Sequence, residues 1–202
     1  MVCILIAGPP ASGKSTLAAR LSAALGIPVL SKDAIKERLF DEVGFTCREE
    51  KVRLGRAASA IQLEVARASF ACGKSVMLED NFERATRNAV RQTLHACGCP
   101  ALTVLLRGEM PALYERFVRR DESPLRHRGH VVNDRYPELP GQKARRTTPA
   151  LEDFAQSIAR RGMDEPPLED GPCITVDVTD LAAVDWDGVV ARVRAWVAEN
   201  GG

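Results

Sequence analysis

Short, continuously apolar runs alternate with longer stretches of helical periodicity along this chain. The apolar runs read VCILIAG at 2–8, PVLS at 28–31, SVMLED at 75–80, ALTVLLR at 101–107 and CITVDV at 173–178. Helices are predicted from about Lys14, from about Lys32, at about 48–71, before residue 101, from about Met110 and at 186–199. Buried strands joined by helices are typical of a parallel sheet that is covered on both faces. The pattern therefore predicts an α/β fold.

One stretch departs from this alternation. Residues 121–149 contain four prolines and many arginines and show little periodicity. A loop of that length in a compact domain is usually functional or disordered. We expect a single domain over residues 1–202, with a lid or substrate segment at about 116–149. In the helix that begins near Lys32, we expect Ile35, Leu39 and Val43 to form the buried stripe.

Composition narrows the class of protein. The chain has 202 residues, 45% of them hydrophobic and 27% charged, with a net charge of +1, so no global field draws it to nucleic acid or to an anionic membrane. The apolar run at the start is too short to span a membrane and lacks the basic leader of a secretory signal. Six cysteines lie within apolar or helical patterns and favour reduced thiols in the cytoplasm. HACGC, at 95–99, could hold a metal, but no second cluster has zinc-like spacing.

The first turn carries the clearest chemical motif. The segment GPPASGKST, residues 8–16, fits G-x-x-x-x-G-K-[ST] and lies between a predicted strand and a predicted helix, as that motif requires. Its backbone N–H groups and the helix N-terminus favour a phosphate. Lys14 is expected to reach the β- and γ-phosphates, and the Ser15 hydroxyl to bind Mg²⁺. The predicted nucleotide-binding residues are Gly8, Pro9, Pro10, Ala11, Ser12, Gly13, Lys14, Ser15 and Thr16.

A second GKS, at 73–75, is not expected to bind phosphate. Ala68 stands where the upstream glycine of the motif would be, and the segment follows a helix and precedes a strand, which is the reverse order. We expect Gly73 to end the long helix.

Two acidic residues end the third apolar run. Glu79 and Asp80 follow a buried strand, and a carboxylate at that place can hold Mg²⁺ or its waters opposite Ser15. We expect Glu79 to serve as this acid, with Asp80 as the substitute. The alternative is that both residues cap the helix that begins near Glu83.

Asp33 follows the second apolar run, PVLSK. Ligands of doubly wound sheets bind beyond the carboxyl ends of the strands, so Asp33 and Lys36 are free to face the cleft. Capping of the next helix is the rival role for Asp33, and Ser31 could also supply that cap. We expect Asp33 to take a proton from the hydroxyl of a substrate.

These motifs together resemble the small P-loop kinases of the zeta-toxin and polynucleotide-kinase-like group, AAA-type ATP-binding enzymes related to chloramphenicol phosphotransferase and to gluconate- or shikimate-type kinases. The resemblance rests on GPPASGKST, LSKD, VMLEDNF and the arginine-rich segment. It implies a three-layer P-loop fold with a five-stranded parallel sheet in the order 2-3-1-4-5. It also implies that Asp33 faces the γ-phosphate and activates the acceptor. Glu79 stands where that group more usually has Asp.

The segment YERFVRRDESPLRHRGH, at 114–130, supplies the arginines of a lid. We expect Arg120 and Arg116 to stabilise the transferred phosphoryl group, and Arg120 and Arg126 to contact the nucleotide. A solvated basic face is the alternative. Substrate contacts are expected from Asp33, Lys36, Asn81, Phe82 and Arg128, while His127 and His130 are assigned to lid structure or substrate contacts.

The sequence thus predicts an ATP-dependent, Mg²⁺-requiring kinase, with GTP as the alternative donor, that acts on a hydroxyl group of a small polar acceptor. Aromatic residues make up only 5% of the chain, which gives little support for a base-stacking track. A polynucleotide 5′-hydroxyl kinase and a regulatory NTPase without an acceptor stay open as alternatives. The acceptor and the oligomeric state are not readable from the sequence.

Overall fold

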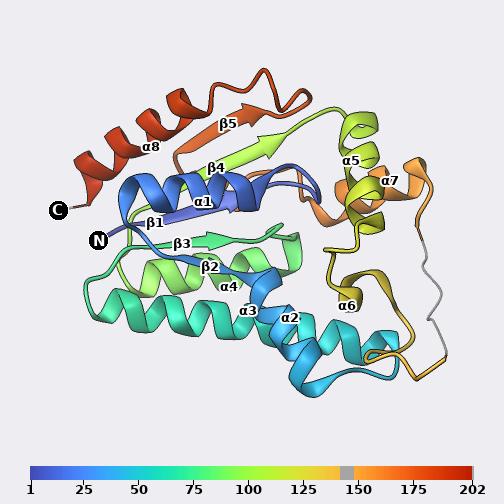
Figure 1. Cartoon of the computed structure of the whole chain (residues 1–202). Coiled ribbons are helices and arrows are strands. Elements are labelled where there is room, and N and C mark those ends of the chain that lie inside the picture. Colours follow the sequence, from blue (N-terminus) through green and yellow to red (C-terminus); the bar gives the residue numbers. More distant parts are fainter. Residues whose placement is uncertain (142–147, 202) are drawn as a thin grey trace.

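Five parallel strands form the centre of the molecule (Figure 1). The computed structural model describes residues 1–141 and 148–201. The strands are β1 (Cys3–Ala7), β2 (Val29–Ser31), β3 (Val76–Glu79), β4 (Ala101–Arg107) and β5 (Cys173–Asp177). Their order in the sheet is β2-β3-β1-β4-β5, with every neighbouring pair parallel. This order confirms the predicted fold.

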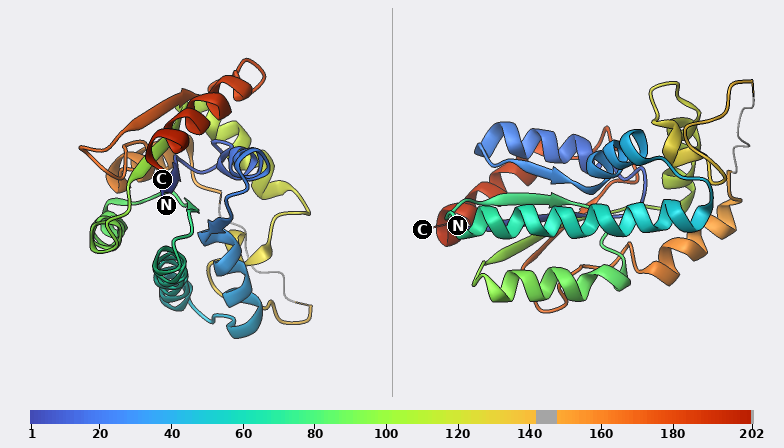
Figure 2. Two further views of the ribbon diagram at one scale, coloured as in Figure 1. Left: turned by 90° about the vertical axis from the view of Figure 1, so that its left-hand side faces the viewer. Right: turned by 90° about the horizontal axis from the view of Figure 1, so that it is seen from below.

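Helices cover both faces of the sheet (Figure 2). Their bounds are α1 (Lys14–Leu25), α2 (Lys32–Val43), α3 (Arg48–Ala71), α4 (Arg84–Ala96), α5 (Met110–Glu122), α6 (Arg128–Val131), α7 (Leu151–Arg161) and α8 (Trp186–Asn200). One core cluster joins the sheet to α1, α5, α7 and α8, and a second joins it to α3 and α4. The layers follow from the chain order, because each parallel crossover places a helix against one face.

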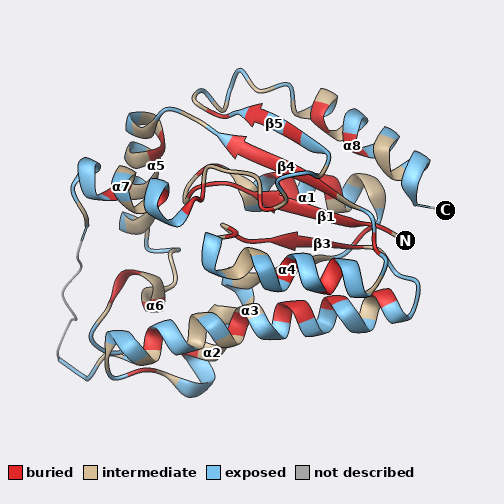
Figure 3. Cartoon of the chain, turned by 180° about the vertical axis from the view of Figure 1, so that it is seen from behind, coloured by how far each residue is buried: buried red, intermediate tan, exposed pale blue. Residues whose placement is uncertain are grey.

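The alternation of side chains along β1 explains why both layers are needed. Every residue from Val2 to Ala7 is fully buried, as the red centre of Figure 3 shows. Ile4 and Ile6 belong to the α1 side of the core, whereas Cys3, Leu5 and Ala7 belong to the α3 side. A strand that is apolar on both faces is stable only when both faces are covered.

The register of the sheet gathers three loops at one edge. Ile6 of β1 and Ser31 of β2 are both paired with Glu79 of β3. The turn after β1, the start of α2 and the end of β3 therefore meet beyond the same carboxyl ends.

The buried side of α2 differs from the expectation. Val43 is 67% exposed, whereas Phe40 is fully buried, and Ile35 and Leu39 are half-buried. The reason is that α2 packs against a third cluster, formed with the segment around α6, rather than lying flat on the sheet. That cluster consists of Phe40, Phe45, Val131 and Val132, with Leu54 and Tyr136 packed against it.

The described part of the proline-rich stretch, 121–141 with 148–149, contains one short helix. After α5 ends at Glu122, the chain forms α6 and then runs along α2 and α3, where Phe45 and Tyr136 form an isolated antiparallel bridge. Residues 142–147, which fall within the predicted lid segment, lie outside the described residues.

The second GKS lies where the helix prediction placed it. The helix α3 ends at Ala71, and Gly73 has a φ of +69°, which is the left-handed conformation that commonly follows a helix. Within residues 1–141 and 148–201, no helix has both the length and the apolar character that crossing a bilayer requires.

Candidate active site

The turn between β1 and α1 forms a cradle for an anion. Gly13 is the N-cap of α1 at a φ of +93°, and no side chain caps the helix, so its first N–H groups have no acceptor within the helix. Gly8 has a φ of +144°, and a Cβ there would lie 2.5 Å from the Leu106 carbonyl oxygen. Glycine is therefore required at position 8 for the loop to approach β4 this closely.

Lys14 lies over this loop. Its ammonium group donates hydrogen bonds to the carbonyl oxygens of Gly8 (3.0 Å) and Pro9 (2.8 Å). Burial lowers the pKa of Lys14 to about 8, against the opposing effect of the Glu79 and Asp33 carboxylates. The carbonyls hold the ammonium but do not neutralise it, so a phosphate that binds here would supply the missing negative charge.

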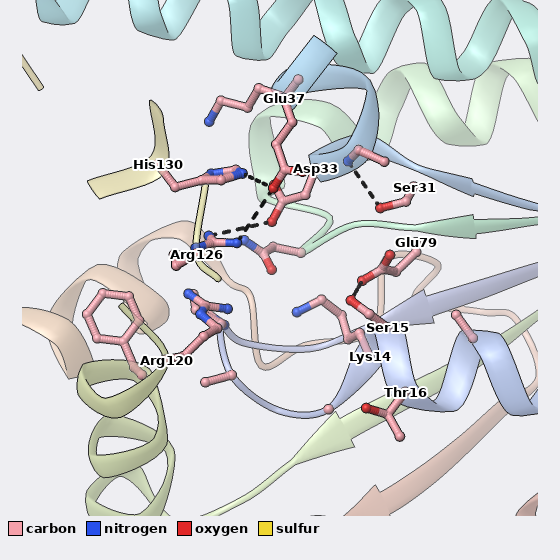
Figure 4. Close-up of a pocket in the computed structure, with 18 of the residues that line it drawn as sticks. Lys14, Ser15, Thr16, Ser31, Asp33, Glu37, Glu79, Arg120, Arg126 and His130 are labelled. Carbon is pink, nitrogen blue, oxygen red and sulfur yellow. Dashed lines mark hydrogen bonds and ion pairs between the residues drawn. The ribbon is translucent and has the colours of Figure 1, made fainter. Parts of the chain in front are cut away.

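Glu79 and Asp80 have different partners. The Ser15 hydroxyl donates a hydrogen bond to Glu79 Oε1 at 2.7 Å, as the dashed line in Figure 4 marks. The Asp80 carboxylate forms a buried ion pair with Lys32 Nζ at 3.0 Å and accepts the N–H of Asn81 at 2.7 Å. Glu79 is therefore better placed than Asp80 for the role of metal acid, because the charge of Asp80 is already paired with Lys32. Neither residue caps α4, whose N-cap is Glu83 without a side-chain cap.

Oxygen ligands at Ser15 and Glu79 fit Mg²⁺. Among the described residues, no three His, Cys, Asp or Glu side chains form a metal-binding group. Mg²⁺ in phosphoryl-transfer sites is usually held by one or two protein oxygens together with the substrate phosphates and water, rather than by a protein cage. The oxygens of Ser15 and Glu79 therefore suit a Mg²⁺ ion that binds together with the nucleotide.

Asp33 faces the cradle and does not cap its helix. The N-cap of α2 is Ser31, whose hydroxyl accepts the N–H of Ala34 at 3.4 Å. Asp33 Oδ2 lies 4.0 Å from Arg126 Nη2, and more than half of its side chain is exposed. Partial burial raises the pKa of Asp33. The charges of His130, which is protonated at the low pH where a carboxyl group titrates, and of Arg126, Lys36 and Lys14 outweigh that effect and leave the pKa below the ordinary value. Asp33 is thus a carboxylate at neutral pH.

Three of the arginines that we predicted for a lid line the same cavity. Within the described part of the chain, Arg116 has two buried nitrogens, Nε and Nη2, without a hydrogen-bond partner, and burial lowers its pKa. Arg120 donates to Asp121 Oδ1 at 3.2 Å and lies over the ring of Phe117. Arg126 lies between Asp33, Glu37 and Asp121. Two more basic residues of the cavity, Lys36 and Arg161, come from α2 and α7.

The cavity has a volume of about 1430 Å³ and joins these groups in one space (Figure 4). Of the predicted residues, the cavity lining includes Pro10, Ala11, Gly13, Lys14, Ser15, Thr16, Asp33, Lys36, Glu79, Asn81, Arg116, Arg120 and Arg126. Gly8 and Pro9 contribute their carbonyls to Lys14, and Ser12 is buried beneath the loop.

Two predicted substrate residues lie elsewhere. Phe82 is buried in the core cluster on the α3 side, since it turns inward at the end of β3. Arg128 donates two hydrogen bonds to Glu138, at 2.9 and 2.7 Å, and is not among the residues that line the cavity. Neither side chain is part of the cavity lining, so the structure gives no support to these two predictions of a substrate contact.

Sequence reasoning missed several residues of the site. Glu37 lies one helical turn after Asp33, accepts a hydrogen bond from His130 and lines the cavity. Gln62 of α3 donates to the Leu30 carbonyl at 2.7 Å and to the Glu79 carbonyl at 3.1 Å, so it joins the ends of β2 and β3. The spacing of Asp33 and Glu37 could have revealed the first residue; a buried glutamine on a long helix gives a weaker signal.

Comparison with known proteins gives a consistent picture of the fold. A protein of Chloroflexus aurantiacus j-10-fl, described as a candidate kinase, matches with a TM-score of 0.77 and 25% identity over 98% of this chain and 97% of that chain. Shikimate kinase from Bacteroides thetaiotaomicron matches with a TM-score of 0.56 and 16% identity over 98% of each chain, which shows the fold alone.

A curated relative shares a shorter region. The cytidylate kinase of Ignicoccus hospitalis is 39% identical over 49 residues, which is 24% of this chain and 28% of that kinase's length. A family model described as an AAA domain covers much more, residues 3–135. That match runs from β1 through the cradle, Asp33, Glu79 and α6, and the chain therefore belongs to this AAA domain family of P-loop proteins.

Proposed function

We propose that this protein is a kinase that transfers the γ-phosphate of ATP to a hydroxyl group of a small polar acceptor. One observation carries the proposal: the phosphate cradle and the Asp33 carboxylate face each other across a single cavity. A nucleotide-binding switch has no need of a carboxylate and free basic side chains beyond the terminal phosphate.

The chain's own residues divide the work as follows. Lys14 and the amides of the cradle hold the β- and γ-phosphates. The acceptor oxygen attacks the γ-phosphorus, the bond from that phosphorus to the bridging oxygen breaks, and the nucleoside diphosphate leaves. Asp33 takes the proton of the acceptor hydroxyl. Arg116 and Arg120 stabilise the charge on the transferred group, as arginines do in phosphoryl transfer.

Ser15 and Glu79 would hold Mg²⁺, which would supply positive charge to offset the negative charge of the phosphates when it is bound. Their hydrogen bond, at 2.7 Å, supports this role, because it holds the two oxygens side by side next to the cradle. ATP is the proposed donor, and GTP the alternative.

The acceptor side of the cavity supports a small polar compound. Charged and amide groups line it, among them Lys36, Glu37, Arg48, Asn81, Asn133 and Arg161. The aromatic side chains of the lining are Phe117 and His130, so stacking platforms for a series of bases are scarce in the described part of the chain. A short acceptor with several polar groups fits this wall better than a polynucleotide.

We further propose that residues 1–202 form one kinase domain with its lid at 116–149. Within the family we place the chain near the zeta-toxin and polynucleotide-kinase-like group, on the motifs of its sequence. Six unpaired cysteines support action in the cytoplasm.

A screen for transfer tests the function. Purified protein is incubated with labelled ATP, Mg²⁺ and panels of sugars, hydroxy acids, nucleosides, aminoglycosides and oligonucleotides, and labelled products are separated from ATP. Transfer to a small acceptor supports the proposal. Transfer only to oligonucleotides, with a steep dependence of acceptor affinity on salt, would favour a polynucleotide kinase. ATP hydrolysis that no acceptor stimulates would favour a regulatory NTPase.

A further inference from the structure

A buried lysine of α3 bonds the segment at 130–133 at three points, and Arg48 of the same helix adds a longer hydrogen bond to Asn133 (3.4 Å). Lys51, in the first turn of α3, donates from Nζ to the carbonyl oxygens of His130 (2.8 Å) and Val132 (2.5 Å) and to Asn133 Oδ1 (3.1 Å). An ammonium group has three donors. All three are used, and all three acceptors belong to this one segment. Lys51 therefore docks the lid on α3.

A second contact fixes the same segment to α2. His130 Nε2 lies 2.9 Å from Glu37 Oε1, and the His130 side chain is 7% exposed. Burial lowers the pKa of His130, against the effect of the Glu37 and Asp33 carboxylates, so a neutral ring that donates from Nε2 describes the pair. Gly129 completes the docking, because a Cβ there would collide with the ring of Phe40.

Arg126, four residues before His130, forms no comparable side-chain hydrogen bond with any residue of 1–141 or 148–201. Its guanidinium nitrogens lie 4.0 Å from Asp33, 3.9 Å from Glu37 and 3.6 Å from Asp121. These separations are ion-pair distances but exceed hydrogen-bond length. Arg126 Nε is buried without a hydrogen-bond partner among the described residues. The place of Arg126 is therefore set by the docked segment, and its donors stay available for a ligand.

We propose that Lys51 and His130 are positioning residues, which dock the segment 126–133 on α2 and α3 and thereby hold the Arg126 guanidinium beside Asp33. This inference rests on the proposed kinase function. A purely structural role is the alternative, in which the two residues stabilise the fold and the place of Arg126 has no bearing on transfer.

Lys51→Met tests the first anchor, since it keeps the length of the side chain and removes all three donors. Because a displacement of about 1 Å can cost on the order of 10²-fold in rate, we expect kcat for transfer to fall by about that factor. The affinity for ATP is expected to change little, because the cradle is not part of this contact. Amide hydrogen exchange in 126–132 should become faster. Glu50→Gln, next to Lys51 but bonded to Thr46, is the matched control and should leave exchange in this segment and kcat unchanged.

Substitutions of His130 give a second test, which can be carried out even if Lys51→Met fails to fold. His130→Gln keeps an N–H donor near the position of Nε2, whereas His130→Leu removes it. We expect kcat of His130→Gln to lie much closer to that of the wild type than kcat of His130→Leu.

A double-mutant cycle with Arg126→Ala separates positioning from general stability. If Lys51 and His130 act through Arg126, they should matter little once Arg126 is gone. The kcat of Arg126→Ala combined with Lys51→Met or His130→Leu should therefore lie within roughly threefold of the kcat of Arg126→Ala alone, which is about the additivity error of such cycles. The proposal would be overturned if the losses in kcat of the single variants were fully additive in the double variants. It would also be overturned if amide hydrogen exchange in residues 126–132 were the same in Lys51→Met as in the wild type. Absence of transfer by the wild-type protein would refute the kinase function itself, and the exchange experiment would still decide whether Lys51 docks the lid.

Discussion

Replacing Gly8 by alanine should lower both the stability of the fold and the affinity of the phosphate cradle for ATP. Gly8 has a φ of +144°, and a Cβ would lie 2.5 Å from the Leu106 carbonyl oxygen and 2.9 Å from Ser12 Oγ. Leu106 belongs to a buried strand, so the loop rather than β4 must move, by about 1 Å to reach an ordinary contact distance. Backbone strain of about 1–3 kcal/mol and overpacking of about 1–3 kcal/mol should together lower the free energy of unfolding by about 3 kcal/mol.

The control for this change is Gly26→Ala. Gly26 has a φ of +68°, and a Cβ there would meet nothing within 4 Å, so the backbone conformation alone should cost about 1 kcal/mol. Urea unfolding gives both free energies, and titration with ATP gives the affinities. We expect Gly8→Ala to lose at least about tenfold in affinity, or about 1.4 kcal/mol, and Gly26→Ala to bind as the wild type does. Equal free energies of unfolding and normal ATP affinities for the two variants would contradict the claim that the close approach of the loop to β4 requires glycine at position 8.

Three further predictions concern the charged groups of the site. Glu79→Gln keeps the hydrogen bond from Ser15 but removes the charge, so the Mg²⁺ concentration for half-maximal transfer should rise about 10- to 100-fold; an unchanged Mg²⁺ titration would exclude Glu79 as the metal acid. Lys14 has a pKa of about 8 in the free protein, and bound phosphate favours its charged form. The affinity for ATP should therefore be constant below that pH and decline as the pH rises above it. An affinity that stays constant from pH 7 to about 9.5 would contradict this role of Lys14. Arg116→Ala should lower kcat by about 10³-fold or more, whereas Arg119→Ala, an exposed neighbour on α5, should have little effect on kcat; equal losses in steady-state assays would contradict the distinction.

The parts of the molecule that local sequence determines were predicted well. Residues 8–16 form a contiguous motif, so its strand, turn and helix could be recognised together, and the bounds of α1, α2 and α3 follow the periodicity closely. The strand order came from family resemblance, because apolar runs alone do not specify which strands are neighbours.

Features that depend on distant partners were predicted less well. Phe40, rather than Val43, is buried on α2 because the segment around α6 covers that side of the helix. Asp80 is paired with Lys32, which lies 48 positions earlier in the chain, and the spacing of the two residues gave no sign of this ion pair. The acceptors of Lys51 lie 79 and more positions away and are mostly backbone carbonyls, which no side-chain pattern reveals.

Rapid-quench measurement of phosphoryl transfer by Asp33→Asn tests the central claim most directly. Ser31 supplies the cap of α2, so this substitution should leave the free energy of unfolding within about 0.5 kcal/mol of the wild type. Asp41→Asn, two turns later on α2 and bonded to His127, is the matched control. The account predicts that Asp33→Asn still binds ATP while transfer to the acceptor falls by about 10²- to 10⁴-fold. Transfer at the wild-type rate by this variant would contradict the account.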